Sequence, residues 1–257
     1  MTDEYIEFIA RIKCKLGIDL TLYKEAQMKR RLTSLRDKRG FTNFDDYYNA
    51  MEQDNDLLVE FADRITINVS EFFRNPKRWD VLIQKVIPML ANTKRSLTIW
   101  SAACSTGEEP YSIALIMREY FPQLSLKLIA TDIDDNVISK AKMGKYQSSA
   151  LKDLPLELRD KYFQLVNGYY ELDESIKKMV QFKKHNLLED AYPKNVDLII
   201  CRNVLIYFTD QAKDKIYTDF SKALQSDGVL FVGSTEQIFS PSKYGLHLLD
   251  TFFYQKD

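Results

Sequence analysis

A segment of small residues, Ser101–Ser112, directly follows the apolar run Leu97–Trp100 and leads into residues with helical spacing. A strand, a tight loop and a helix in this order are typical of a doubly wound α/β sheet, which holds its cofactor at such a loop. Small side chains let a ligand approach the backbone. Pro110 suits a first helical turn, where its missing N–H costs nothing. The sequence therefore predicts a ligand site at residues 101–112.

The ligand expected at this loop is not a dinucleotide. Gly107 is the only glycine of the loop, whereas the dinucleotide fingerprint is rich in glycine. Glu108 and Glu109 follow at the expected helix N-terminus, where carboxylates would repel a pyrophosphate. They suit a ligand that carries amino, hydroxyl or sulfonium groups.

Apolar runs alternate with helical segments along the rest of the chain. Since helices separate most of these runs, the sequence predicts an α/β fold with a mainly parallel sheet. The expected strands are Leu97–Ser101, Leu126–Thr131, Val180–Lys183, Val196–Cys201 and Val229–Gly233. The tail Leu246–Tyr254 is expected to add one more strand, antiparallel to these.

A small insertion is expected within this sheet. Asn167-Gly168 separates two short runs, Phe163–Val166 and Tyr169–Leu172. Asn-Gly between such runs is the strongest short-range signal for a β-hairpin. We therefore expect a small antiparallel β-subdomain at residues 160–180, with Lys178–Lys184 as the candidate partner strand.

The first part of the chain shows only helical periodicity. Thr42 and Asn55 are expected to cap two of its helices, and a further helix is expected from Pro76 to near Pro88. The predicted organisation is an all-helical domain at residues 1–75, a linker helix at 76–95 and an α/β domain at 96–257.

The composition limits the location and the chemistry. No run approaches the ~20 apolar residues of a membrane span, and the first residues lack the order of a signal peptide, so we expect a cytoplasmic protein. The three cysteines have no CxxC spacing and only two histidines occur, which argues against a disulfide framework and a metal site.

The net charge of −1 hides a basic segment. Residues 24–39 hold seven basic and two acidic side chains, while the rest of the chain is acidic. A run of charge is most often a solvated helix face. The alternative is a local docking surface for an acidic protein, and DNA is disfavoured because no aromatic residues are interleaved.

Polar side chains follow two of the expected strands at their carboxyl ends. Asp132 ends the second strand, where an acidic residue accepts hydrogen bonds from ribose hydroxyls; the alternative is a helix cap. Arg202 and Asn203 follow the fourth strand, where such sheets bind ligands, although an arginine there can also extend to water. Tyr207 suits the core as well as the site.

Two further candidates carry weaker signals. Asn186 and Leu187 follow the third strand, where a polar residue more often serves the turn itself. The segment Asn68-Val-Ser-Glu-Phe-Phe-Arg74 precedes the α/β part. Its two phenylalanines suit ordinary packing, but ligand pockets favour junctions between domains.

Together these motifs resemble the chemotaxis receptor methyltransferases of the CheR family over nearly the whole chain. The segments that carry the resemblance are Asn68–Arg74, Trp100–Ser112, Ala130–Asp134 and Cys201–Phe208. It implies an N-terminal helical domain and a class I, Rossmann-like methyltransferase domain with an inserted antiparallel β-subdomain. It also implies methyl transfer from S-adenosylmethionine to glutamate side chains of chemoreceptor cytoplasmic domains, with S-adenosylhomocysteine as the second product.

The resemblance also assigns site residues. It implies cofactor contacts at Asn68, Ser70, Arg74, Glu109, Asp132, Asn186, Leu187, Arg202 and Asn203. We expect catalytic roles for Arg74 and Tyr207. The basic helix resembles the receptor-docking helix of the family, through Lys29, Arg30, Arg31, Arg36, Lys38 and Arg39.

A glutamate carboxylate needs no general base, because its reference pKa of about 4.3 leaves it ionised near pH 7. No catalytic histidine is therefore expected. One alternative is a regulatory module that binds S-adenosylmethionine without turnover. Another is a methyltransferase that acts on a small molecule or nucleic acid. We expect a monomer that neither binds nucleic acid nor inserts into a membrane.

Overall fold

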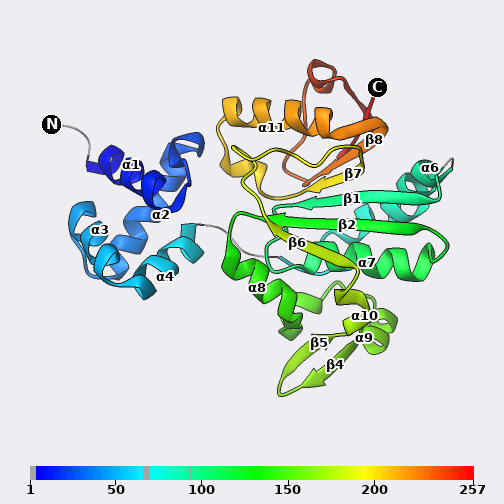
Figure 1. Cartoon of the computed structure of the whole chain (residues 1–257), viewed down its shortest axis with the longest axis horizontal. Helices are drawn as coiled ribbons and strands as arrows, with labels where there is room; N and C mark the ends of the chain where they lie inside the picture. Colours follow the sequence, from blue (N-terminus) through cyan, green and yellow to red (C-terminus); the bar gives the residue numbers. More distant parts are fainter. Residues whose placement is uncertain (1–3, 66–69, 93) are drawn as a thin grey trace. The chain divides into compact units, whose positions relative to one another are not determined.

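A computed structural model describes residues 4–65, 70–92 and 94–257 of the chain. These residues fall into two units, Met1–Asn68 with Ile206–Asp214, and Val69–Leu205 with Lys215–Asp257 (Figure 1). The first unit is helical, and the second is built on a large sheet.

Aromatic side chains hold the helices of the first unit together. Phe8 is fully buried, and the centre of its ring lies 4.6 Å from that of Phe44 and 5.7 Å from that of Phe61. The prediction of an all-helical N-terminal domain is confirmed. Its helices are α1 (Glu4–Leu16), η1 (Leu20–Leu22), α2 (Glu25–Lys38), α3 (Phe44–Gln53) and α4 (Asn55–Ile65).

The caps of α3 and α4 differ from the prediction by one residue each. The side chain of Asn43, not Thr42, accepts a hydrogen bond from the backbone N of Asp46 at 2.7 Å. The side chain of Asp54, not Asn55, accepts one from the backbone N of Asp56 at 2.9 Å. Thr, Asn and Asp all occur as N-cap residues, so the sequence alone does not decide which of two neighbours caps the helix.

A segment from far along the chain completes the first unit. Phe208 forms an antiparallel bridge with Tyr23, and the two ring centres lie 4.8 Å apart. The backbone N of Lys24 donates to the carbonyl of Tyr207 at 2.8 Å, and that of Thr209 to the carbonyl of Leu22 at 2.9 Å. This segment comprises η4 (Leu205–Tyr207) and the start of α11 (Asp210–Ala223).

The sheet of the second unit has the strand order β6–β2–β1–β7–β8–β10–β9. The first five strands in that order are parallel, and β10 is antiparallel to both of its neighbours, which confirms the mainly parallel sheet. The tail forms two strands, not one, because the chain turns at Thr251–Phe252. The strands are β1 (Ser96–Ala102), β2 (Ser125–Asp132), β6 (Val180–Lys184), β7 (Val196–Cys201), β8 (Leu224–Val232), β9 (Leu246–Asp250) and β10 (Phe253–Lys256).

Strand β1 lies where the order of the strands reverses. The strand that follows it in sequence, β2, pairs on one side, and β7 pairs on the other. Open α/β sheets bind ligands beyond the carboxyl ends of the strands at such a point. Helix α7 (Glu108–Tyr120) connects β1 to β2 and packs on β2 and β6, and α8 (Asp135–Met143) packs beside the same two strands (Figure 1).

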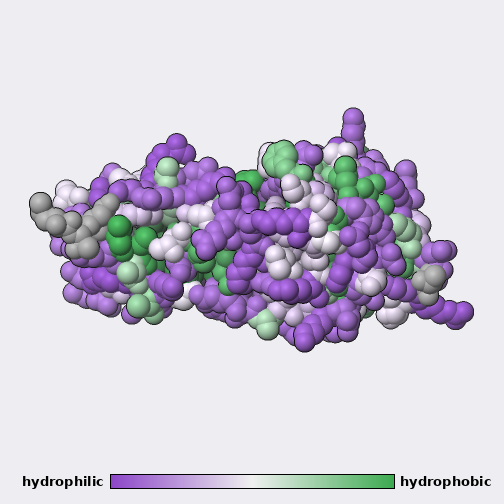
Figure 2. Space-filling view, turned by 90° about the horizontal axis from the view of Figure 1, so that it is seen from above, coloured by the Kyte–Doolittle hydropathy of each residue, from purple (hydrophilic) through white to green (hydrophobic). Residues whose placement is uncertain are grey.

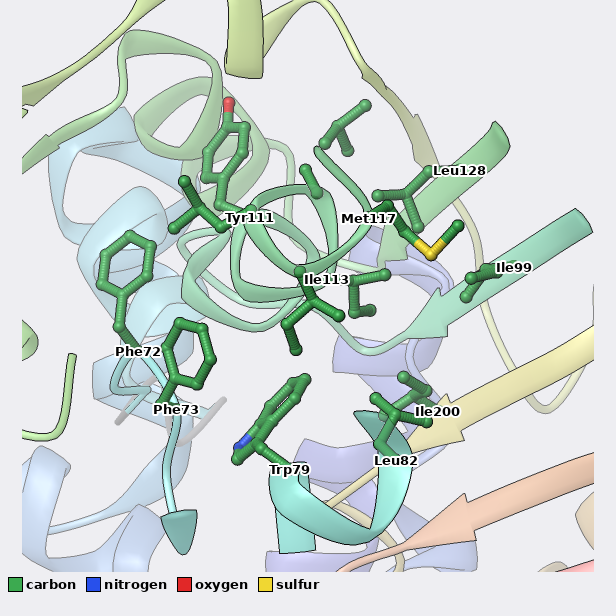
Figure 3. Packing of buried hydrophobic residues seen from close by; sticks show 14 of the residues in the cluster. Phe72, Phe73, Trp79, Leu82, Ile99, Tyr111, Ile113, Met117, Leu128 and Ile200 are labelled. Atoms are coloured by element: carbon green, nitrogen blue, oxygen red, sulfur yellow. The ribbon is translucent and has the colours of Figure 1, made fainter. Parts of the chain in front are cut away.

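Helix α7 is the centre of the hydrophobic core. Residues 111–117 are each exposed by 2% or less. Figure 3 shows Phe72 and Phe73 pointing toward this helix, with Trp79 below Ile113. A helix that is apolar on all sides must be covered from all sides, so the segment before residue 76 is fixed against the sheet domain.

The predicted linker helix does not end near Pro88. It runs as α5 (Pro76–Val81), a π-helical turn η2 (Leu82–Val86) and α6 (Ile87–Ala91). The backbone N of Ile87 donates to the carbonyl of Leu82, five residues earlier. A proline lacks an N–H and crowds the carbonyl four residues before it. The wider π turn just before Pro88 lets the helix continue past it.

The predicted hairpin forms, with another partner strand than expected. β4 (Phe163–Val166) and β5 (Tyr169–Leu172) meet at Asn167-Gly168, where both residues have positive φ. The third strand is β3 (Lys145–Tyr146), not Lys178–Lys184, which contains β6 of the large sheet. From the sequence, the same residues were expected both in the large sheet and beside the hairpin. They pair with β2 of the large sheet. Short helical turns η3 (Ser148–Leu151), α9 (Leu156–Tyr162) and α10 (Glu174–Lys177) surround the small sheet, and η5 (Pro241–Tyr244) precedes β9.

The surface shown in Figure 2 is mostly hydrophilic, with small hydrophobic areas scattered over it. Leu165 and Tyr169, at the tip of the hairpin, and Phe239, after β8, are large apolar residues with strong exposure. Within residues 4–65, 70–92 and 94–257, every helix is too short or too polar to cross a membrane.

Candidate functional site

The loop after β1 bends sharply before α7 begins. Ala103, Ser105 and Gly107 all have positive φ, at 60°, 49° and 95°. Such backbone is costly for residues with a side chain and is held in place by its surroundings. Here the backbone N of Cys104 donates to the carbonyl of Thr131 at 2.9 Å. A Cβ on Gly107 would lie 2.9 Å from the Cβ of Ala141, so the loop packs too closely for any other residue.

Asp132 joins this loop to the end of β2. Its Oδ2 accepts a hydrogen bond from the backbone N of Ser105 at 2.8 Å, and its Oδ1 accepts one from the backbone N of Asp134 at 3.1 Å. Asp134, not Asp132, caps α8, since its side chain accepts from the backbone N of Asn136 at 2.8 Å. Burial raises the pKa of the Asp132 carboxyl to about 6.

Glu109 of α7 lies next to Arg202 at the end of β7. Its Oε1 accepts from the hydroxyl of Ser101 at 2.9 Å, and its Oε2 lies 3.6 Å from Nη1 of Arg202. Burial raises the pKa of the Glu109 carboxyl, and the guanidinium acts against that rise. Arg202 of the chain itself thus supplies positive charge next to the Glu109 carboxylate, where the sequence had suggested a charged ligand group.

Arg202 connects the end of β7 to the segment before α5. Its Nη2 donates to the carbonyl of Arg74 at 2.8 Å and to Oδ1 of Asn75 at 3.0 Å. Its guanidinium lies 4.8 Å from the ring centre of Phe231. Burial lowers the pKa of the guanidinium, and the positive charge of Arg74 acts in the same direction. The arginine is therefore buried, not extended to water.

Asn203 has the left-handed conformation, with φ of 62°. Its backbone N donates to Oε2 of Glu236 at 2.7 Å. Glu236 was not among the predicted site residues. A signal existed, because it follows the apolar run of β8 at the same end of the sheet as Arg202 and Asp132.

The segment from Ser70 to Asn75 runs beside the start of α7. The backbone N of Phe73 donates to the hydroxyl of Ser112 at 3.1 Å. Ser70 forms a side-chain hydrogen bond with Glu108, whose carboxylate also accepts from the hydroxyl of Thr106 at 2.8 Å. Burial raises the pKa of Glu108. Asn68, the other predicted residue of this segment, lies outside the described residues.

Asn186 and Leu187 lie in the loop after β6. The side chain of Asn186 accepts a hydrogen bond from the backbone N of Leu188 at 3.0 Å, so it does serve the turn. Leu187 is buried. The loop is tied to the site at its start, because the backbone N of His185 donates to the carbonyl of Asp132 at 2.8 Å.

Tyr207 lies in the first unit, unlike the residues above. Its ring lies 5.8 Å from the guanidinium carbon of Arg31 of α2. Arg31 also donates to the carbonyl of Ile65 at 2.6 Å, and burial lowers the pKa of its guanidinium. Arg31 therefore contributes to the packing of this unit.

The other predicted docking residues differ in exposure. Arg36 pairs with Asp37 at 2.7 Å and lies 4.7 Å from the ring centre of Phe44, and Arg39 pairs with Glu60. Lys29 lies 5.0 Å from the ring centre of Tyr5. Arg30 and Lys38 are exposed and eight positions apart, on the outer face of α2.

Three buried side-chain polar atoms have no hydrogen-bond partner among the described residues: Ser105 Oγ, His185 Nδ1 and Arg202 Nε. They follow β1, β6 and β7, so all three lie at the carboxyl end of the sheet. Buried polar groups are nearly always hydrogen-bonded, and the exceptions mark functional places. Buried polar atoms without a partner thus gather at this end of the sheet, which makes it the candidate ligand site.

Comparison with known proteins identifies the two parts of the chain. The family profile described as "CheR methyltransferase, SAM binding domain" matches residues 68–251, and the profile described as "CheR methyltransferase, all-alpha domain" matches residues 3–66. All the residues at the carboxyl end of the sheet fall within the first of these ranges.

Similar proteins cover almost the whole chain. A chemotaxis protein methyltransferase of Listeria innocua is 44% identical over 254 residues, which is 98% of this chain and 97% of that protein. A chemotaxis protein methyltransferase of Borreliella burgdorferi is 38% identical over 250 residues, which is 92% of this chain and 88% of that protein.

Proposed function

The chain belongs to the CheR family of methyltransferases, and from this membership we propose that it methylates glutamate side chains of chemoreceptor cytoplasmic domains. It is an S-adenosylmethionine-dependent methyltransferase, as the matched domain and its relatives show. Those relatives are named for chemotaxis. The proposal concerns the substrate and the roles of single residues.

The carboxyl end of the sheet fits S-adenosylmethionine. The cofactor carries ribose hydroxyls, an amino group, a carboxylate and a sulfonium. The polar atoms there without a partner, Ser105 Oγ, His185 Nδ1 and Arg202 Nε, include donors and acceptors. These atoms are the observation that carries the proposed binding site. The residues proposed to hold the cofactor are Asn68, Ser70, Arg74, Glu109, Asp132, Asn186, Leu187, Arg202 and Asn203.

Bound S-adenosylmethionine supplies an electrophilic methyl group. The residues of the chain have to bring a glutamate carboxylate in line with it, and no base is needed, because the carboxylate is ionised near pH 7. Arg74 is proposed to bind a carboxylate, and Tyr207 to orient the incoming oxygen. The side chains of Glu109, Arg202 and Asp132 are almost enclosed, which strengthens their electrostatic interactions with a bound cofactor.

The first unit is proposed to dock the receptor. The basic residues of α2 and its end, Lys29, Arg30, Arg31, Arg36, Lys38 and Arg39, favour an acidic protein surface over nucleic acid. The transfer itself is proposed to take place at the carboxyl end of the sheet in the second unit. The receptor's signalling domains lie in the cytoplasm, so the chain is proposed to act there, as a monomer.

Incubation of the purified chain with methyl-labelled S-adenosylmethionine and a receptor cytoplasmic fragment tests the substrate. We expect label on glutamate side chains, released by mild base as a methyl ester would be. The control is a fragment with its accepting glutamates changed to alanine.

Other outcomes would decide between the alternatives. Cofactor binding without transfer to the fragment would favour a regulatory module. Label on nucleic acid or on small molecules of an extract, with none on the fragment, would reject the proposed substrate.

A further inference from the structure

The loop after β8 turns one carboxylate back into the site. Ser234, Thr235 and Gln237 are exposed, whereas Glu236 between them is 5% exposed. A buried carboxylate is costly unless its oxygens accept hydrogen bonds. The hydrogen bonds of Glu236 therefore explain how a carboxylate can be buried at this position.

Glu236 binds the ends of two neighbouring strands with one oxygen. Its Oε2 accepts from the backbone N of Asn203 at 2.7 Å and from that of Gly233 at 2.8 Å. β7 and β8 are paired up to Cys201 and Val232, so Gly233 lies one residue and Asn203 two residues beyond the pairing. Hydrogen bonds to a carboxylate are about twice as strong as neutral ones.

Gly233 leaves room for this arrangement. A Cβ at this position would lie 2.4 Å from Oε2 of Glu236 and 2.8 Å from the backbone N of Asn203. The glycine is therefore required by the carboxylate. On the other side, the contact helps to hold Asn203 in its left-handed conformation, which favours asparagine or glycine over other residues.

Glu236 also adds negative charge beside the buried arginine. It acts electrostatically on both Arg202 and Glu109. The guanidinium of Arg202 is enclosed by aromatic rings and contacts Glu109 at 3.6 Å. A second carboxylate nearby helps to keep a buried cation in place.

We propose that Glu236 is a positioning residue, which holds Asn203 and Arg202 in the conformation that binds S-adenosylmethionine. It acts through these two residues and does not touch the reacting atoms. The inference rests on the cofactor contacts proposed above for Arg202 and Asn203.

The test compares Glu236→Ala and Glu236→Gln with a matched control, Asp197→Ala. Asp197 is also a buried carboxylate, and its Oδ2 accepts from the backbone N of Thr98 at 2.7 Å, but it lies at the other end of β7. The measurements are the dissociation constant for S-adenosylmethionine by calorimetry, the exchange rate of the Asn203 amide without cofactor, and the melting temperature.

We expect Glu236→Ala to weaken cofactor binding by about tenfold or more and to speed exchange of the Asn203 amide. Glu236→Gln should stay within about threefold of the unchanged chain, because one amide oxygen can still accept from both N–H groups. Asp197→Ala should lower the melting temperature while its cofactor affinity stays within about twofold.

Equal loss of affinity in Asp197→Ala and Glu236→Ala would overturn the inference, because affinity would then follow stability alone. Unchanged affinity in Glu236→Ala would overturn it as well. If the alanine variant does not fold, Glu236→Asp replaces it: this side chain keeps the charge but is too short, and it should bind worse than Glu236→Gln. Failure of the unchanged chain to bind the cofactor counts against the proposed site, while the amide exchange still tests the contact to Asn203.

Discussion

At the scale of single residues, Asp132 has a structural role beside the ribose contact that we propose for it. Its oxygens accept the backbone N–H groups of Ser105 and Asp134, and the backbone N–H of Ile133 also stabilises the carboxylate. A carboxylate has about four lone-pair sites, so it can also accept a ribose hydroxyl. The side chain is therefore already oriented by the chain before any ligand arrives.

The raised pKa of Asp132 predicts how cofactor binding depends on pH. Burial moves the pKa from 3.8 to about 6, so the carboxyl is ionised above that pH and protonated below it. Ribose hydroxyls donate to the ionised form. Affinity should be constant above about pH 7 and fall by up to about tenfold per pH unit below 6.

Calorimetry between about pH 5 and 8 measures this dependence, with Asp132→Ala as the control. The variant should bind weakly and without the change near the pKa. The ribose role is wrong if the variant shows the same pH dependence, or if it binds as tightly as the unchanged chain.

Some residues of the candidate site could be predicted from the sequence because they lie at the end of an apolar strand. Asp132 and Arg202 could be selected because each directly follows an apolar strand. Glu236 was missed, because it lies four residues beyond the end of β8, within a polar loop, and not directly at the strand end. The main partner of Arg202 is the backbone carbonyl of Arg74, which no side-chain pattern reveals.

At the scale of elements, the junction of β1 and α7 is fixed by Gly107. Its φ is 95°, and an added Cβ would meet Ala141 at 2.9 Å and Tyr111 at 3.1 Å. Gly107→Ala thus combines backbone strain with a clash. We expect it to lower the free energy of unfolding by about 2–5 kcal/mol, the sum of a left-handed penalty and overpacking.

Urea denaturation measures this loss. Gly168→Ala is the control, because Gly168 also has positive φ but has no atom within 4 Å of an added Cβ. The control should cost only the backbone strain, about 1–2 kcal/mol. Equal losses in the two variants would show that the close packing of the loop contributes nothing.

The sequence predicted the helices and strands that are long enough to show a regular spacing of apolar residues. Most parallel strands were predicted from runs of apolar residues, as in β7, where every residue is buried, whereas the edge strand β6 is largely exposed. The π turn before Pro88 and the two-residue strand β3 were not, since neither is long enough to show a period. The second strand of the tail begins one residue after the turn at Phe252, which separates it from β9 without glycine or proline.

At the scale of the whole molecule, the docking role proposed for α2 can be tested separately from methyl transfer. Arg30 and Lys38 are exposed, whereas Arg31 and Arg36 take part in the packing of the first unit. The double variant Arg30→Glu, Lys38→Glu should therefore fold normally. We expect it to lose most receptor methylation, at least about tenfold, while its affinity for S-adenosylmethionine is unchanged.

The control reverses two exposed lysines of the second unit, Lys127→Glu with Lys183→Glu. Methylation by this variant should stay near that of the unchanged chain. Added salt should slow the unchanged chain more than the Arg30, Lys38 variant, because it screens the attraction that the variant has lost. Full methylation by the docking variant at moderate salt would reject this role of α2.

The bridge between Tyr23 and Phe208 limits how this protein can be recombined with its relatives. The all-alpha family domain ends at residue 66, yet residues 206–214 fold with it. In a chimaera joined only near residue 67, residues 22–24 would come from one parent and residues 207–209, which contact them, from the other. The backbone hydrogen bonds between these two stretches would still form. The two rings at positions 23 and 208, however, would come from different parents. Exchange of an intact first unit between relatives therefore calls for transfer of both stretches together.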